Sequence, residues 1–143
     1  MKPIQIVIDT NVLVSAVRSK GGASFALISR LHEQGFKTCL SNAILLEYEE
    51  KLKVELRRQG RDDLETVDAL LNHILAISKR CSVHGSLPVD GIHPGDQFVF
   101  DLAIAAEARV IITFNAKHFR GAEEWGISVM RPAQFLRLLE DLA

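Results

Sequence analysis

A run of β-branched residues that ends on a carboxylate most strongly limits how this chain can fold. Residues 4–8 read Ile-Gln-Ile-Val-Ile, and Asp9 and Asn11 follow directly. So continuous an apolar run is typical of a strand that is covered on both faces of a sheet. In open α/β sheets, ligands bind beyond the carboxyl ends of the strands. A carboxylate at that edge needs a cation, hydrogen-bond donors or water as its partner.

The composition is that of an ordinary globular protein. The 143 residues are 48% hydrophobic and 24% charged, which suits a single domain over residues 1–143 with a sizeable core. The formal net charge of −1 gives no overall basic field for nucleic acid, although a local basic patch would serve. No apolar run approaches the roughly 18 residues of a membrane span, so we expect no membrane partner. Two distant cysteines and the lack of a targeting segment favour a reducing cytoplasm.

Hydrophobic periodicity predicts strands that alternate with helices. Strands are expected at residues 4–8, 36–40, 110–114 and within 125–130, and helices at about 23–34, 42–59, 62–77, 96–108 and from 132 onward. Residues 81–95 hold three glycines and two prolines and are expected to be loop. The prediction is an α/β fold, with a mostly parallel central sheet of four to five strands flanked by helices and a two-helix insertion around residues 42–80.

Acidic residues in the first half of the chain are candidate site residues, each with an ordinary structural explanation. Asp9 is also a good N-cap for a following helix. Glu47 and Glu49 flank the buried face of the 42–59 helix on opposite sides, so helical periodicity does not choose between them. Glu47 and Lys51, at i,i+4, would equally suit a solvated face.

The second half of the chain adds two more aspartates and an asparagine. Asp96 stands at a loop-to-helix junction, where an N-cap is the simple explanation. Asp101 lies in an apolar segment, where an unpaired carboxylate is costly, and this favours a functional role. Asn115 follows a buried strand, as Asp9 does, but a turn asparagine beside an exposed Lys117-His118 pair would look the same.

Taken in order, these segments resemble the PIN-domain family of metal-dependent ribonucleases, which includes VapC-type toxins of toxin–antitoxin pairs. The resemblance extends over essentially the whole chain. The matching segments are Asp9-Thr-Asn-Val-Leu-Val-Ser, Ser41-Asn-Ala-Ile-Leu-Leu-Glu47, Asp96-Gln-Phe-Val-Phe-Asp101-Leu-Ala-Ile-Ala-Ala, Ile111-Ile-Thr-Phe-Asn115-Ala-Lys-His-Phe119 and the C-terminal Met130-Arg-Pro-Ala-Gln-Phe-Leu.

The resemblance implies a metal site and assigns residues to it. It favours Glu47 over Glu49 and implies a carboxylate core of Asp9, Glu47 and Asp101, with Asp96 as a further ligand or a supporting residue. Subfamilies differ on whether the key third acid falls at the Asp96 or the Asp101 position, and this chain has both. Oxygen-only ligands favour Mg²⁺ or Mn²⁺ over Zn²⁺. Many members have a fourth aspartate where this chain has an asparagine, which leaves one metal ion or two open. Substrate or water would be positioned by Thr10, Asn11, Thr113, Asn115, Lys117 and His118.

The function that the resemblance implies is endonucleolytic cleavage of single-stranded RNA by a toxin that a small antitoxin holds in check, with a homodimer as a further expectation. The asparagine at position 115 motivates an alternative, a PIN-fold module that binds RNA or protein with weakened or lost nuclease activity. A phosphatase or receiver-like protein with Asp9 as phosphoacceptor is disfavoured. The first would need an aspartate where Asn11 stands, and the second an acidic pair near the first strand.

Overall fold

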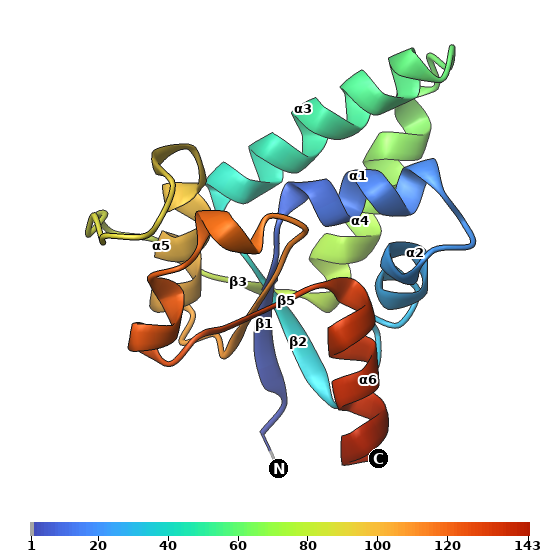
Figure 1. Ribbon diagram of the computed structural model, residues 1–143. Coiled ribbons are helices and arrows are strands. Elements are labelled where there is room, and N and C mark those ends of the chain that lie inside the picture. The colour runs from blue at the N-terminus through green and yellow to red at the C-terminus, as the bar shows by residue number, and fades with distance from the viewer. Residues whose placement is uncertain (1) are drawn as a thin grey trace.

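The computed structural model describes residues 2–143 and contains one parallel five-stranded sheet (Figure 1). The strand order is β3-β2-β1-β4-β5, and every neighbouring pair is parallel. The α/β class and the parallel sheet predicted from the sequence are therefore confirmed. The strands are β1 (Ile4–Ile8), β2 (Phe36–Leu40), β3 (Lys79–Arg80), β4 (Val110–Ile112) and β5 (Ser128–Met130).

In the described part of the chain, six α-helices surround the sheet: α1 (Thr10–Arg18), α2 (Ala23–Ile28), α3 (Asn42–Arg58), α4 (Leu64–Ile77), α5 (Gln97–Ala105) and α6 (Pro132–Leu142). Figure 1 shows α5 on one side of the sheet and α2 and α6 on the other, while α1 and α3 lie together beyond the carboxyl end of β1. The pair α3 and α4 is the expected two-helix insertion. Within residues 2–143, no helix combines the length and the apolar character needed to cross a bilayer.

The central strand is held by burial on both faces. Ile6, Val7 and Ile8 of β1 are almost inaccessible to solvent, as the unbroken apolar run predicts. Each such side chain contributes about 1.5–3 kcal/mol by leaving water. On the β2 side, the ring of Phe36 meets that of Phe135 from α6 edge to face, with the centroids 5.3 Å apart. This packing joins the C-terminal helix to the sheet.

The chain leaves β1 at the point where the order of the sheet reverses. From β1 the chain continues to β2 on one side, and only much later returns to β4 on the other. The Asp9 amide donates to the Ile112 carbonyl over 2.9 Å, so Asp9 and Thr113 lie side by side just past β1 and β4. Such a switch point is where open α/β sheets bind ligands.

Some element bounds differ from the sequence prediction. The helix expected at 23–34 ends at Ile28, where the Ser29 hydroxyl bonds back to the Phe25 carbonyl over 2.8 Å and the chain begins to turn. The helix expected at 96–108 runs from Gln97 to Ala105 after a short 3-10 helix, Pro94–Asp96. The short edge strand β3 carries only charged residues and has no hydrophobic pattern by which to find it.

Candidate active site

Asp9 is a buried carboxylate at the start of α1. Only 5% of the residue is accessible, and it occupies the N-cap position that the sequence allowed. One carboxylate oxygen, Oδ1, accepts the Thr10 amide over 2.8 Å, and Oδ2 accepts the Thr113 hydroxyl over 2.7 Å. The capping and site interpretations of Asp9 are thus compatible, because the second oxygen is directed to the end of β4 rather than to the helix.

Thr113 connects the three polar side chains at the ends of β1 and β4. Thr113 is completely buried, and its hydroxyl donates to Asp9. The same hydroxyl oxygen accepts the Asn115 amide over 2.9 Å and lies 3.5 Å from the Asn11 side-chain nitrogen. Asn11 in turn accepts the Phe114 amide over 3.3 Å. These bonds fix Asp9, Asn11 and Asn115 relative to one another across the switch point.

Helix α3 brings Glu47, and not Glu49, beside Asp9. The buried Tyr48 hydroxyl donates to the Ile8 carbonyl, one residue before Asp9, and so anchors the first turns of α3 to the end of β1. Glu47 then lines an open cavity of about 420 Å³ together with Asp9. Glu49 faces another hollow and pairs with Lys53 at 2.7 Å. No ion pair joins Glu47 to Lys51 among residues 2–143.

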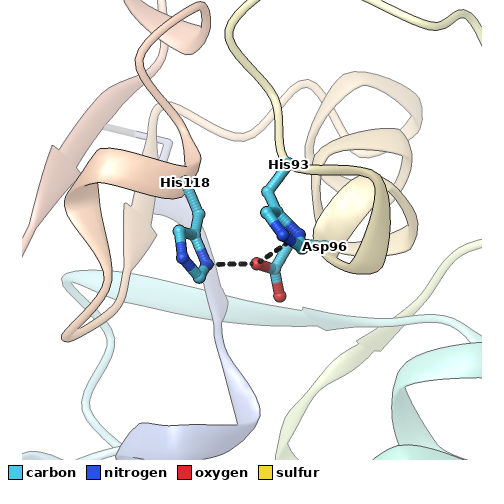
Figure 2. A group of neighbouring side chains, drawn as sticks. All are labelled: His93, Asp96 and His118. Atoms are coloured by element: carbon cyan, nitrogen blue, oxygen red, sulfur yellow. Dashed lines mark hydrogen bonds and ion pairs between the residues drawn. The ribbon is translucent and has the colours of Figure 1, made fainter.

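Asp96 lies beside two histidines on neighbouring loops (Figure 2). Its Oδ2 lies 2.7 Å from His118 Nδ1 and 3.9 Å from His93 Nδ1, and the two imidazole rings stack with centroids 4.5 Å apart. Asp96 takes the N-cap position of α5, but its side chain makes no capping bond. The carboxylate is therefore oriented by His118 rather than by the helix it precedes.

A close backbone approach holds the two histidine-bearing loops together. The His93 amide donates to the His118 carbonyl over 2.8 Å, and Ile92 and Phe119 form an antiparallel bridge. A Cβ atom added at Gly121 would lie 2.2 Å from the Asp90 carbonyl oxygen, so only glycine fits there. The pairing of segments some 25 residues apart thus places Asp96 against His118.

Among the described residues, four carboxylates line this cavity: those of Asp9, Glu47 and Asp96, and that of Glu55, which two arginines neutralise. Burial raises the pKa of the Asp9 carboxyl, and the negative charges of Asp96 and Glu47 raise it further. The hydrogen bonds from Thr113 and Thr10 lower the pKa without reversing the direction of the shift. The cavity therefore concentrates negative charge around a carboxylate that lies out of water.

The donor set of this cavity suits a hard divalent cation. Thr10 is one of the residues that line the cavity, and its hydroxyl is buried with no hydrogen-bond partner among residues 2–143. Carboxylate, hydroxyl and amide oxygens are the ligands that Mg²⁺ and Mn²⁺ prefer. In the described chain the carboxylates of Asp9, Glu47 and Asp96 are not all within 4.8 Å of one another, so shared ligation to one ion requires side-chain rotation.

The one group within residues 2–143 whose ligand atoms all lie that close is His93, Asp96 and His118. Its nitrogen donors would suit a softer ion than Mg²⁺. However, His93 Nδ1 already accepts the Gly95 amide over 3.0 Å. The imidazole of His118 accordingly acts as a partner that orients Asp96.

The remaining predicted site residues lie elsewhere. Asp101 is outside the cavity: it accepts a 2.8 Å hydrogen bond from the Gln97 side chain and lines two other hollows. The structure does not bring Asp101 to the cavity of Asp9 and Glu47, because five residues of helix rotate a side chain by about 140° from the direction of Asp96. Lys117 is exposed on the short 3-10 helix Ala116–His118 and does not line the cavity. Asn115, like Asn11 and Thr10, does line it.

The other end of the cavity carries a cluster that the sequence did not reveal. Arg18 from α1 and Arg58 from α3 both bind the buried carboxylate of Glu55, each with a closest N–O distance of 2.7 Å. These bonds lower the pKa of Glu55 to about 2. The only sequence signal was the i,i+3 spacing of Glu55 and Arg58, which is common on solvated helices.

Comparison with known proteins agrees with this architecture. The family model of the PIN domain matches residues 5–117, most of the chain. The chain belongs to the PIN-domain family. PIN domains are generally metal-dependent nucleases, and the match extends over the segments that carry Asp9, Glu47 and Asp96.

A solved structure shows the same fold over nearly the full length. The crystal structure of PAE2754 from Pyrobaculum aerophilum aligns with a TM-score of 0.57 at 17% sequence identity and covers 96% of this chain and 90% of that one. At this identity the likeness shows the fold alone. No curated protein matches this PIN domain in sequence.

Proposed function

We propose that this PIN domain is a divalent-metal-dependent endoribonuclease that cleaves single-stranded RNA. The observation that carries the proposal is the convergence of Asp9, Glu47 and Asp96 on one open cavity at the switch point of the sheet. Like charges around a buried carboxylate are costly unless a cation neutralises them, and a phosphodiester substrate brings further negative charge.

Asp9, Glu47 and Asp96 would hold Mg²⁺ or Mn²⁺, with the Thr10 hydroxyl as a further oxygen beside Asp9. When bound, such an ion supplies charge neutralisation at the phosphodiester and makes an attacking water more acidic. The chain itself contributes positioning. Thr113 holds Asp9 in place, and His118 holds Asp96. The side-chain amides of Asn11 and Asn115 would orient water or a phosphate oxygen at the cavity wall.

The biological context proposed is that of a cytoplasmic toxin with a small antitoxin as its partner. The PIN family includes such toxins, and a protein that blocked this open cavity would silence the site. A homodimer is part of the same proposal. A neighbouring reading frame that encodes a small DNA-binding protein would support the toxin role. A genome with no such reading frame beside this gene would count against it.

Cleavage assays with matched variants test the enzymatic proposal. Purified protein should cut varied single-stranded RNAs with Mg²⁺ or Mn²⁺ and lose this activity in Asp9→Asn, Glu47→Gln and Asp96→Asn. Glu49→Gln is the matched control on the same helix and should cleave normally. Asp101→Asn decides the third acid: we expect activity to persist. An inactive wild type, or an Asp9→Asn variant that cleaves as well as wild type, would refute the proposal.

A second candidate function is a PIN module that binds RNA or protein without cutting it. Two observations favour it: Asn115 stands in the cavity without a charge, and the three carboxylates are spread beyond 4.8 Å. Calorimetric titration with Mn²⁺ separates the two functions. A nuclease site should bind the ion in the micromolar to millimolar range and lose binding in Asp9→Asn, whereas a degenerate site should show no heat.

A further inference from the structure

The cavity that holds the three carboxylates of the proposed metal site is basic at its other end. Arg18 from α1 and Arg58 from α3 line that end together with Glu55, and Lys51 lies on α3 midway between Glu47 and Glu55. Lys51 is exposed and makes no ion pair in the part of the chain from residue 2 to 143. The net charge of the side chains that line the cavity therefore changes from negative at one end to positive at the other.

Glu55 holds the two arginines in fixed positions. The glutamate is only 3% exposed, while the side chains of Arg18 and Arg58 are 56% and 58% exposed. Both carboxylate oxygens are saturated, because Gln59 adds a hydrogen bond of 3.0 Å to those from the two guanidinium groups. Within the described residues, Nη1 of each arginine donates to no protein atom.

The pairing of two arginines with one buried glutamate is more than the stability of the fold requires. One arginine would neutralise the glutamate, and a buried ion pair is in any case a poor source of stability compared with apolar packing. Two arginines around one buried acid leave a net positive charge that faces the cavity. The guanidinium groups are also held in advance, so a ligand would not bear the entropic cost of ordering them.

We infer that Arg18, Arg58 and Lys51 bind the phosphate backbone of a single-stranded RNA whose scissile phosphate lies at the acidic end of the same cavity. The inference rests on the proposed nuclease function and adds the path of the substrate. Guanidinium forks match phosphate geometry, and an ammonium group adds a point charge. Val14 and Val54, which also line the cavity, offer an apolar surface to the bases.

The length of α3 determines how far apart the two contacts lie. Glu47, Lys51 and Glu55 repeat every four residues and share one face of the helix. Eight residues at a rise of 1.5 Å give a separation of about 12 Å. A stacked strand advances about 3.4 Å per nucleotide, so the basic end would meet a phosphate about three to four nucleotides from the scissile one. A dinucleotide would not reach it, whereas an octanucleotide would.

Fluorescence anisotropy with labelled oligouridylates tests this placement without any cleavage step. Hydrolysis-resistant phosphorothioate forms of the dinucleotide and octanucleotide are titrated with the full-length chain in Mn²⁺, because without a cation the carboxylates would repel a phosphate from the acidic end. The variant Arg18→Lys/Arg58→Lys keeps both charges but loses the forks, and it should bind the octanucleotide about tenfold more weakly. Its affinity for the dinucleotide should stay within about twofold of wild type. The matched control is Arg30→Lys/Arg61→Lys, two ion-paired arginines outside the cavity, and it should bind both lengths as wild type does.

Salt dependence gives a second measurement that does not depend on how well a variant is packed. Lys51→Ala should reduce the slope of log K against log salt by about 0.7, the value for one single-strand phosphate contact. The triple variant Arg18→Gln/Glu55→Gln/Arg58→Gln removes the arginines without leaving a bare buried acid, and its slope should fall by up to about 1.4. Circular dichroism melts check that each variant is folded.

The inference is overturned if wild type binds the two lengths equally, or if the lysine double variant and the triple variant both bind the octanucleotide like wild type. In that event, the basic end serves some other ligand, such as an acidic protein segment. The nuclease proposal fails separately: a chain that binds the octanucleotide through Arg18 and Arg58 but cuts no RNA with Mg²⁺ or Mn²⁺ retains this binding site and loses the proposed activity.

Discussion

Replacing Thr113 with valine should destabilise the metal-free protein by about 3 kcal/mol at neutral pH. Valine has nearly the shape of threonine, so the packing of this completely buried side chain is retained and only the hydroxyl is lost. That hydroxyl donates to Asp9 over 2.7 Å and accepts the Asn115 amide over 2.9 Å. A hydrogen bond to a charged group contributes about 1.5–3 kcal/mol, and an amide left without a partner costs about 1–3 kcal/mol, although the two do not add fully.

The loss should depend on pH in a definite direction. The Asp9 carboxyl already has a raised pKa, mainly through burial, and the Thr113 hydroxyl opposes that shift. Without the hydroxyl the pKa of Asp9 rises further. A carboxyl whose pKa is raised by folding favours the folded state at acid pH and loses that contribution as the pH rises through the folded pKa. The gap between wild type and Thr113→Val should therefore widen from about pH 4, near the ordinary aspartate pKa, to pH 7.

Urea unfolding in EDTA at these two pH values measures the gap, and Thr113→Ser provides the control. Serine keeps the hydroxyl and loses one methyl group, which should cost about 1 kcal/mol with little change in pH dependence. The reasoning is refuted if Thr113→Val is as stable as wild type at pH 7, if serine costs as much as valine, or if the gap is the same at both pH values.

Three further variants test other parts of the structure. Tyr48→Phe should cost about 1 kcal/mol in urea, equally from pH 5 to 8, because burial raises the pKa of this tyrosine and keeps it neutral; a loss that changes over that range would contradict this. Gly121→Ala places a Cβ against the Asp90 carbonyl and should cost about 3 kcal/mol or more in a thermal melt, whereas Gly35→Ala, which meets no atom within 4 Å, should cost less than about 1 kcal/mol. Glu55→Gln should be less stable than wild type above about pH 4.5, with a difference that closes as the pH falls to about 2, because wild type loses the contribution of its ionised Glu55 over that range; acid titration followed by circular dichroism measures it.

Local sequence predicts those elements of the fold that have a clear hydrophobic pattern and clear capping residues. The strands at 4–8 and 36–40 have the predicted bounds, because each is rich in apolar or β-branched residues and is followed at once by a polar N-cap residue. Ser41, a residue type that favours helix N-caps, caps α3 and accepts the Ile44 amide over 3.2 Å. The strand β3 escapes such analysis, because a two-residue edge strand of Lys79 and Arg80 is defined only by its neighbour β2.

The site was predictable only in part, because some of its residues are brought together by contacts between distant segments of the chain. Asp9 is recognisable because it ends a buried strand. The choice between Asp96 and Asp101 depends instead on how the loop before α5 pairs with residues 118–121, and no local pattern encodes that pairing. The contact between Arg18 and Glu55 joins residues 37 positions apart, so neither residue by itself indicates a basic end to the cavity.

The position of β1 at the centre of the sheet has a consequence for how the two walls of the cavity open. The Asp9 amide bonds to the Ile112 carbonyl, and β1 is paired on both sides, so its amides should exchange with solvent only when the whole sheet unfolds. Asp96 sits on a three-residue 3-10 helix at the end of a long loop, and its amides should exchange through smaller, local openings. Asp9, which follows the central strand, is thus displaced only when the whole protein unfolds. The segment that carries Asp96 can instead open locally and re-form while the sheet stays intact.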